Sequence, residues 1–203
     1  MPRNFTFALV LTTAAVLLLP WLDPWVFATV RAEGIYNQDW GRLLRVMGFA
    51  PTWILIALGI TLSRRGLTAS RGVRAVRMPG LFLLASIAAT GLVGELVKLV
   101  VRRGRPAPTD GLYSLVPWTG SWSTGALGFP STHAIVAFAG AFAMAKLSPR
   151  SAPVWLALGA GCALTRLLDG KHFLSDVVAA AVLAAGLATI LWEAMSPGRL
   201  DPA

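Results

Sequence analysis

Apolar stretches that can form membrane-spanning helices recur along the whole of this 203-residue chain. A helix crosses the ~30 Å hydrocarbon core of a bilayer in about 20 residues. Six stretches, some of them short but extendable, are predicted to do so, at residues 5–21, 48–62, 79–101, 131–147, 152–168 and 172–195. The pattern therefore predicts an all-α integral membrane protein, a six-transmembrane-helix bundle forming a single domain over residues 1–203.

The beginning of the chain allows two interpretations. Residues 5–21 could be a secretory signal peptide with cleavage after Ala32, but only Arg3 precedes them, whereas signal peptides have a distinctly basic start. We therefore expect a first transmembrane helix. Residues 22–47 mix Trp and Tyr with charged side chains, as segments at a membrane–water interface do. The sequence thus predicts an interfacial segment between the first two spans.

The basic residues bear on topology. Residues 63–78 carry five arginines and no acid, which marks a cytoplasmic loop. Over all loops, however, Lys and Arg number nine on each side of the membrane. The tie is broken if some of the basic residues on the side opposite the termini are held at a phosphate site. Acidic residues also accompany the basic residues on that side. We predict a bacterial inner membrane protein with both termini cytoplasmic and the long loop at 102–130 on the outer, periplasmic face.

Composition supports the membrane assignment and narrows the partners. The chain is 56% hydrophobic and 13% charged, with a mean hydropathy of +0.66, whereas soluble domains have about 25% charged residues. The net charge of +9 indicates anionic partners, namely lipid head groups or phosphates. Nucleic acid is not expected, because a nucleic-acid-binding module would be less apolar. The one cysteine, Cys162, lies in an apolar run and is expected to be buried.

Candidate chemistry begins where the fifth apolar run ends and the sixth begins. Arg166 ends one run, and His172 and Asp176 open the next. In a helix, a spacing of four puts His172 and Asp176 on one face, so the carboxylate can hold one ring nitrogen and leave the other free as a nucleophile or ligand. An ordinary interfacial His and Asp at a helix start is the alternative that this stretch alone does not exclude.

The predicted topology brings other polar residues to the same membrane face. Lys98, Arg105 and Arg166 offer only donors, which suits the oxygens of a phosphate. Ser131 follows Pro130 at a helix start, where a hydroxyl and the first free N–H groups form an anion pocket.

The two histidines of the chain complete this set. His133 can donate a proton to a leaving oxygen, and His172 can attack phosphorus. The sequence contains no cluster of acids typical of a metal site, and two histidines are a poor transition-metal set. The residues predict phosphoryl transfer through a covalent phosphohistidine, with neither metal nor cofactor.

Three segments resemble the signature motifs of the type 2 phosphatidic acid phosphatase family, which also includes bacterial acid phosphatases and vanadium haloperoxidases. The segments are Lys98-Leu-Val-Val-Arg-Arg-Gly-Arg105-Pro106, Pro130-Ser131-Thr132-His133, and Arg166 with His172 and Asp176. The resemblance implies that His172 is the nucleophile, Asp176 its orienting partner, and His133 first the general acid and then the base. Phosphate would be bound by Lys98, Arg105, Arg166, Ser131 and the backbone at Thr132.

Two positions depart from the family pattern. Thr132 stands where the family usually has Gly, so a side chain lies beside the backbone that should approach the phosphate. Thr165 stands where Ser is usual and keeps the hydroxyl.

The expected function is a lipid-phosphate phosphatase. Phosphatidic acid, phosphatidylglycerol phosphate, an isoprenyl diphosphate and a lipid A phosphate all remain open as substrates. A lipid phosphotransferase using the same histidine is the nearest alternative. A second alternative is an anion transporter, since intramembrane charges also mark transport pathways. A third is a metal-binding sensor that uses His133 and His172.

Overall fold

The computed structural model describes residues 18–63, 78–107 and 111–196. Within these ranges the chain is helical and has no β-strand, only two isolated bridges, Arg103–Leu115 and Gly104–Leu127. The elements are a helix at 18–30, η1 (Ile35–Asn37), α2 (Asp39–Val46), α3 (Ala50–Ser63), α5 (Pro79–Val101), α6 (Thr132–Leu147), η2 (Pro149–Ser151), α7 (Ala152–Leu168) and α8 (Leu174–Met195). The predicted all-α architecture is confirmed.

Three of the described helical segments are long and apolar enough to cross a membrane, namely α5, α7 together with η2, and α8. The pair α2 and α3 can count as a fourth span, bent by 64°. Helix α6 is apolar but has 16 residues, roughly 24 Å of helix. Among the described residues, three or four of the six predicted spans therefore correspond to helices long and apolar enough to cross a membrane, and the count of six stays a prediction. The first predicted span, apart from residues 18–21, and most of the arginine-rich loop at 63–78 lie outside the described residues.

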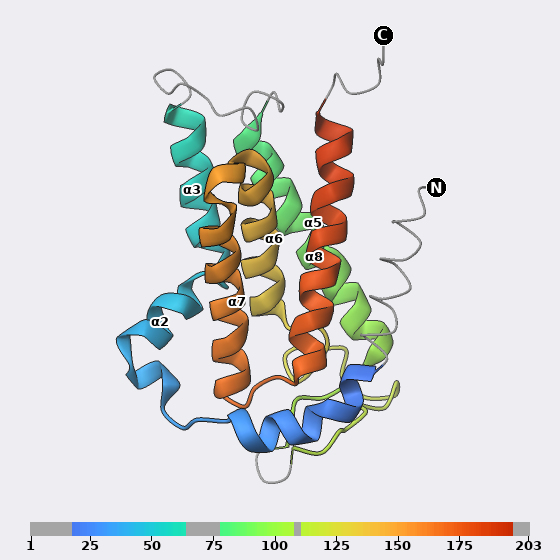
Figure 1. Ribbon diagram of the computed structural model, residues 1–203. Helices are drawn as coiled ribbons and strands as arrows, with labels where there is room; N and C mark the ends of the chain where they lie inside the picture. Colours follow the sequence, from blue (N-terminus) through green and yellow to red (C-terminus); the bar gives the residue numbers. More distant parts are fainter. Residues whose placement is uncertain (1–17, 64–77, 108–110, 197–203) are drawn as a thin grey trace.

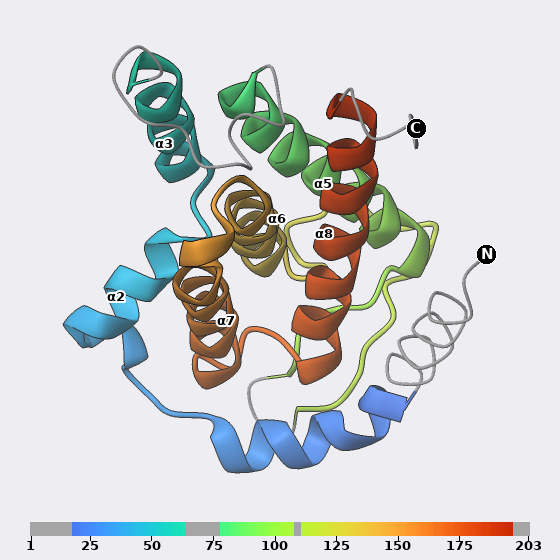
Figure 2. The ribbon, with the colours of Figure 1, turned by 45° about the horizontal axis from the view of Figure 1, so that its top comes forward.

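Helix α6 occupies the centre of the bundle, with α3, α5, α7 and α8 around it (Figure 2). Small side chains allow this, because they let neighbouring helices approach closely. Ala137 and Ala141 are fully buried, and Gly140 faces Trp53 of α3. A Cβ at Gly140 would lie 2.3 Å from the Trp53 ring, so this contact requires glycine.

The helix at 18–30 lies across one end of the bundle, beside the turn between α7 and α8 (Figure 1). Helix α2 follows and packs against α7. Residues 22–47, predicted to be interfacial, are thus largely helical and are gathered at this end. Their position relative to a membrane surface stays a prediction.

The loop between α5 and α6 folds over the same end and is held by Arg102. This residue ends α5 in a left-handed conformation with φ of 51°. Its Nε donates to the Val116 carbonyl at 3.0 Å and its Nη2 to the Ser121 carbonyl at 2.9 Å. Arg102 is 1% exposed, so its side chain is buried beneath the loop that it organises.

Candidate active site

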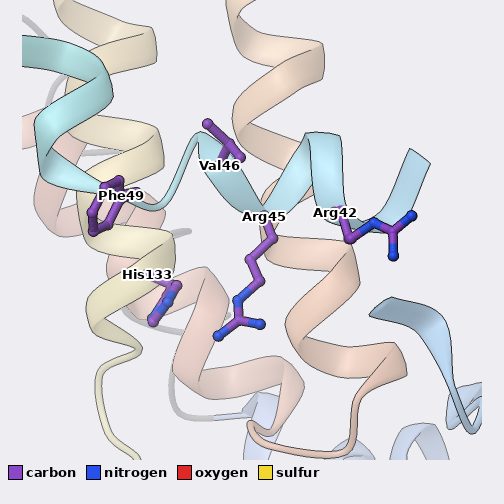
Figure 3. Close-up of a pocket in the computed structure, with 5 residues that line it drawn as sticks. All are labelled: Arg42, Arg45, Val46, Phe49 and His133. Atoms are coloured by element: carbon purple, nitrogen blue, oxygen red, sulfur yellow. The ribbon is translucent and has the colours of Figure 1, made fainter. Parts of the chain in front are cut away.

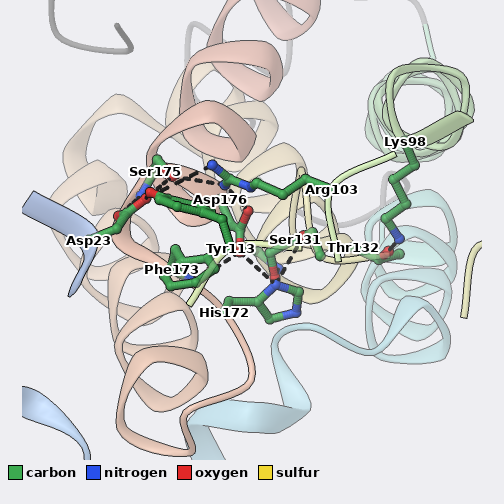
Figure 4. A network of polar contacts seen from close by, with 12 residues as sticks. Asp23, Lys98, Arg103, Tyr113, Ser131, Thr132, His172, Phe173, Ser175 and Asp176 are labelled. Carbon is green, nitrogen blue, oxygen red and sulfur yellow. Dashed lines mark hydrogen bonds and ion pairs between the residues drawn. The ribbon is translucent and has the colours of Figure 1, made fainter. Parts of the chain in front are cut away.

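The structure brings the predicted site residues to one end of the bundle, where α5 and α7 end and α6 and α8 begin (Figures 1 and 4). The two helix starts are joined directly, because the Ser131 N–H donates to the Asp176 carbonyl at 3.2 Å. The residues from the three motifs are therefore neighbours in space. They are Lys98, Arg105, Ser131, Thr132, His133, Arg166, His172 and Asp176.

His172 is 4% exposed, and its Nδ1 lies 3.0 Å from the Gly128 carbonyl oxygen and 3.4 Å from Asp176 Oδ2. A carbonyl oxygen can only accept, so Nδ1 carries the hydrogen in this arrangement. The lone pair is then on Nε2. Burial lowers the pKa of His172 below its ordinary value, and the Asp176 carboxylate opposes that shift only in part. The ring is therefore neutral and oriented, as a nucleophile must be.

The expected helical spacing of four does not explain this pair. Helix α8 begins at Leu174, so His172 precedes the helix and does not share a face with Asp176. Instead, Asp176 lies in the first turn and its Oδ2 accepts the Phe173 N–H at 2.8 Å. A carboxylate that caps the helix start in this way faces the preceding turn, and the turn carries His172.

Asp176 has a second partner that sequence reasoning did not identify. Its Oδ1 accepts a hydrogen bond from Arg103, whose guanidinium also donates to Ser175 Oγ at 2.8 Å. Arg103 is 8% exposed and lies 4.6 Å from the Phe129 ring centroid. Arg103 thus binds the carboxylate that lies beside His172 Nδ1.

A further carboxylate, Asp23, also supports the start of α8 and was likewise missed (Figure 4). It is fully buried and comes from the helix at 18–30. The Ser175 N–H donates to Asp23 Oδ1 at 2.9 Å, and the hydroxyls of Ser175 and Tyr113 donate to its Oδ2. Burial and the Asp23 charge raise the pKa of Tyr113, which keeps this hydroxyl a donor. A lone Asp in a mixed segment gave no signal for this role.

Lys98 and Thr132 meet on the other side of the site. Lys98 is 4% exposed, and its Nζ donates to Glu95 Oε1 at 2.9 Å and to the Thr132 hydroxyl. The Thr132 hydroxyl donates to the same Glu95 oxygen at 3.1 Å. Glu95 and Lys98, three positions apart in α5, thus form an ion pair. The side chain that replaces the family's usual Gly is therefore engaged with Lys98 and Glu95.

Ser131 begins α6 as its N-cap. It is fully buried and its Oγ accepts the Ala134 N–H at 3.5 Å. The N–H groups of Thr132 and His133 donate to no acceptor within the described part of the chain. Two first-turn N–H groups at a helix start can bind the oxygens of an anion.

Arg166 and Arg105 supply positive charge. Arg166 is 5% exposed; its Nη1 donates to the Tyr36 hydroxyl at 2.9 Å and lies 3.7 Å from Asp169 Oδ2. Its Nε is buried and has no hydrogen-bond acceptor among the described residues. Arg105 is exposed, with no carboxylate within ion-pair distance in the described ranges. Both guanidinium groups can therefore accommodate an added anion.

His133 follows Thr132 in the first turn of α6. Its ring borders a cavity of about 280 Å³ between α6 and the bend from α2 to α3 (Figure 3). In the described residues, no group of three or more His, Cys, Asp or Glu side chains forms a metal-ligand cluster.

Comparison with known proteins identifies the family. The model of the PAP2 superfamily matches residues 79–199, which include all three motifs and more than half of the chain. The chain belongs to the PAP2 superfamily. The resemblance drawn from the motifs is thereby confirmed, and the helices that carry those motifs are the ones that the family model covers.

Relatives of this PAP2 protein act on lipid phosphates. A lipid A 1-phosphatase of Rhizobium etli is 28% identical over 190 residues, which cover 88% of this chain and 79% of the relative. A lipid A 1-phosphatase of Rhizobium johnstonii is 31% identical over 102 residues, 49% of this chain and 41% of the relative.

The fold is similar to that of a transmembrane PAP2 type phosphatidylglycerolphosphate phosphatase from Bacillus subtilis, with a TM-score of 0.62 at 17% identity. The match covers 97% of this chain and 96% of the other. Together with the apolar helices, it supports an integral membrane protein.

Proposed function

We propose that this protein is an integral membrane lipid-phosphate phosphatase that works through a phosphohistidine on His172, without a metal ion. The observation that carries the proposal is the environment of His172. Its Nδ1 is held by the Gly128 carbonyl and Asp176, which leaves the Nε2 lone pair available in a site rich in guanidinium groups. Names of the relatives support a lipid phosphate as substrate.

The first chemical step forms a bond between His172 Nε2 and phosphorus and breaks the bond between phosphorus and the leaving oxygen. His133 donates its proton to that oxygen, so the lipid alcohol or lipid phosphate leaves protonated. Asp176 stabilises the positive charge that develops on the His172 ring. Arg103, in turn, keeps this carboxylate in place.

The second step regenerates the enzyme. His133, now neutral, takes a proton from a water molecule, whose oxygen attacks the phosphorus of the phosphohistidine. The bond between phosphorus and Nε2 breaks, and inorganic phosphate leaves. Charge on the three equatorial oxygens would be stabilised in both steps by the same donors: Lys98, Arg105, Arg166, Ser131 and the backbone N–H of Thr132.

The substrate's tails would remain in the bilayer while its head group reaches the end of the bundle. We place this end at the outer, periplasmic face of a bacterial inner membrane, with both termini cytoplasmic and six spans in all. The arginine-rich loop at 63–78 supports this orientation by the positive-inside rule.

Phosphate release by the purified protein in detergent with EDTA tests the proposal. The panel contains phosphatidic acid, phosphatidylglycerol phosphate, an isoprenyl diphosphate and a lipid A phosphate, with His172→Ala and His133→Ala measured alongside. We expect release by the wild type and a loss of at least about 10³-fold in each variant. Release that persists in His172→Ala would contradict the nucleophile assignment, and release abolished by EDTA would contradict metal independence. Transfer of phosphate to an added acceptor lipid, without free phosphate, would indicate a phosphotransferase.

A further inference from the structure

A cavity of about 280 Å³ adjoins His133 (Figure 3). It is lined by Arg42, Arg45, Val46, Phe49 and His133. Of these residues only His133 belongs to a signature motif. The other four come from α2 and from the bend that leads to α3, so the proposed mechanism leaves them without a role.

Arg45 is directed into this cavity and remains available for an anion. Its side chain extends from α2 to the level of the His133 ring (Figure 3). The guanidinium carbon lies 4.6 Å from the Tyr36 ring centroid, and Tyr36 accepts a hydrogen bond from Arg166. Tyr36 therefore lies between the phosphate-site arginine and Arg45. No carboxylate of the described residues forms an ion pair with Arg45.

Arg42 provides a contrast within the same cavity. It forms an ion pair with Asp39 one turn earlier, and its guanidinium points away from His133 (Figure 3). Its charge is therefore already partnered, whereas that of Arg45 is not. The rest of the lining is apolar, because it consists of Val46 and Phe49. Both side chains are accessible to a ligand, being 46% and 59% exposed. A ligand that fits this cavity carries negative charge at one end and hydrocarbon at the other.

The position of His133 indicates which part of a substrate would occupy the cavity. In an in-line displacement, the nucleophile and the leaving group lie on opposite sides of phosphorus. The general acid lies beside the leaving oxygen. A cavity that begins at His133 is therefore on the leaving-group side, and Arg45 lies where a second anionic group of the leaving group would be.

We propose that this cavity is a leaving-group subsite, in which Arg45 binds a second anionic group of the lipid next to the phosphoryl group that is removed. The inference rests on the proposed function and narrows its substrate class. Lipid diphosphates and lipids with a phosphodiester close to a terminal phosphate carry such a group. Phosphatidic acid does not. With a diphosphate, the terminal phosphoryl group passes to His172, the bridging oxygen stays with the lipid monophosphate, and Arg45 stabilises the charge on this product.

The test compares kcat/KM for two substrate pairs. One pair is an isoprenyl diphosphate and the monophosphate of the same chain length; the other is phosphatidylglycerol phosphate and phosphatidic acid with the same acyl chains. For Arg45→Gln we expect a drop of about 10- to 100-fold on the substrates with two anionic groups, and a much smaller drop on the others. Arg45→Lys should recover part of the preference, because the charge remains but the fork of donors does not.

Two matched variants distinguish a specific role of Arg45 from the loss of any one positive charge. Arg150→Gln removes the same charge at an exposed position at the other end of α7, and Arg42→Gln removes it inside the cavity from a side chain already paired with Asp39. Neither should change the ratio between paired substrates. Equal losses on both members of a pair in Arg45→Gln, or the same loss of preference in Arg42→Gln, would overturn the proposal. A wild type inactive on every lipid would instead contradict the proposed function.

Discussion

At the scale of single residues, His172 depends on two acceptors beside one ring nitrogen. The Gly128 carbonyl and the Asp176 carboxylate both lie near Nδ1. They hold the ring in one tautomer and one orientation, while burial keeps it neutral. The pH profile and the Asp176→Asn substitution test this arrangement.

Activity should retain its full value to a lower pH than an ordinary histidine would allow. Only neutral His172 can attack, and burial lowers its pKa below the usual value of about 6.5. The acid limb of kcat/KM should therefore lie below pH ~6.5. An acid limb at or above pH ~6.5 would contradict a buried neutral nucleophile.

Asp176→Asn should lower kcat by about 100-fold or more, because the amide supports the wrong tautomer and no longer balances the charge on the ring. The Asp176 carboxylate raises the pKa of His172, so its removal should move the acid limb to still lower pH. Steady-state kinetics between about pH 4 and 8 measure both effects. A smaller rate with an unmoved acid limb would show that Asp176 does not act through His172.

Thr132→Gly should keep most of the activity. The Thr132 hydroxyl contacts Lys98 and Glu95, but Glu95 still holds Lys98 after its removal. We expect kcat/KM within about fivefold of the wild type, the equivalent of one ordinary hydrogen bond. Thr132→Ala is the matched control, since it also lacks the hydroxyl but does not add the flexibility of glycine. Loss of activity in both variants would show that the hydroxyl itself binds substrate.

At the scale of elements, the bend between α2 and α3 brings the cavity to His133. The two helices meet at 64° around Gly48. A Cβ at this glycine would lie 2.9 Å from the His133 Cβ and 3.0 Å from Cys162 Sγ. The close approach of the bend to α6 therefore depends on the missing side chain. Arg45 and Phe49, on either side of the bend, owe their places in the cavity to it.

Gly48→Ala should displace the bend or His133. Overpacking at a backbone contact costs about 1–3 kcal/mol, so thermal stability in detergent should fall together with kcat. Gly59→Ala is a suitable control in α3, because a Cβ there meets nothing within 4 Å. Wild-type stability and turnover in Gly48→Ala would mean that the bend tolerates a side chain and does not constrain His133.

At the scale of the whole molecule, the active end is closed by parts that are distant in the sequence. The helix at 18–30 contributes Asp23 to the start of α8, and the loop after α5 contributes Arg103 and Tyr113 to the same network (Figure 4). A segment that lies across the bundle thus supports the helix start that carries Asp176, the partner of the proposed nucleophile.

Asp23→Asn should weaken this closure. The amide cannot accept from all three donors of Ser175 and Tyr113, so one buried polar group loses its partner, at a cost of about 1–3 kcal/mol. We expect a lower melting temperature and a reduced kcat with little change in KM. Tyr113→Phe, which removes one of the donors, should have the smaller effect. Unchanged kcat in a destabilised Asp23→Asn protein would limit Asp23 to a structural role.

The sequence by itself determined the helices and the polar residues that gather at one end of the bundle. Hydrophobic runs predicted α5, α6, α7 and α8 to within about two residues, because burial in lipid or in a bundle depends on local composition. The motifs predicted the family, which the family model confirms. They also indicated that the candidate site residues would lie together, since the order of the helices brings their ends to one side; the roles of these residues stay a proposal.

The tertiary structure decided the partners of those groups. Asp23, Tyr36 and Arg45 gave no signal, because charged and aromatic residues near helix ends usually face water or head groups. Arg103 lies inside the first motif, but the sequence did not indicate that it would bind Asp176. Their roles arise from contacts across the fold, such as the 2.9 Å hydrogen bond from the Ser175 N–H to Asp23, 152 positions away. The start of α8 after His172 also depends on a cap and not on periodicity. Long-range polar contacts of this kind leave no periodic pattern in a sequence, so only the folded chain reveals them.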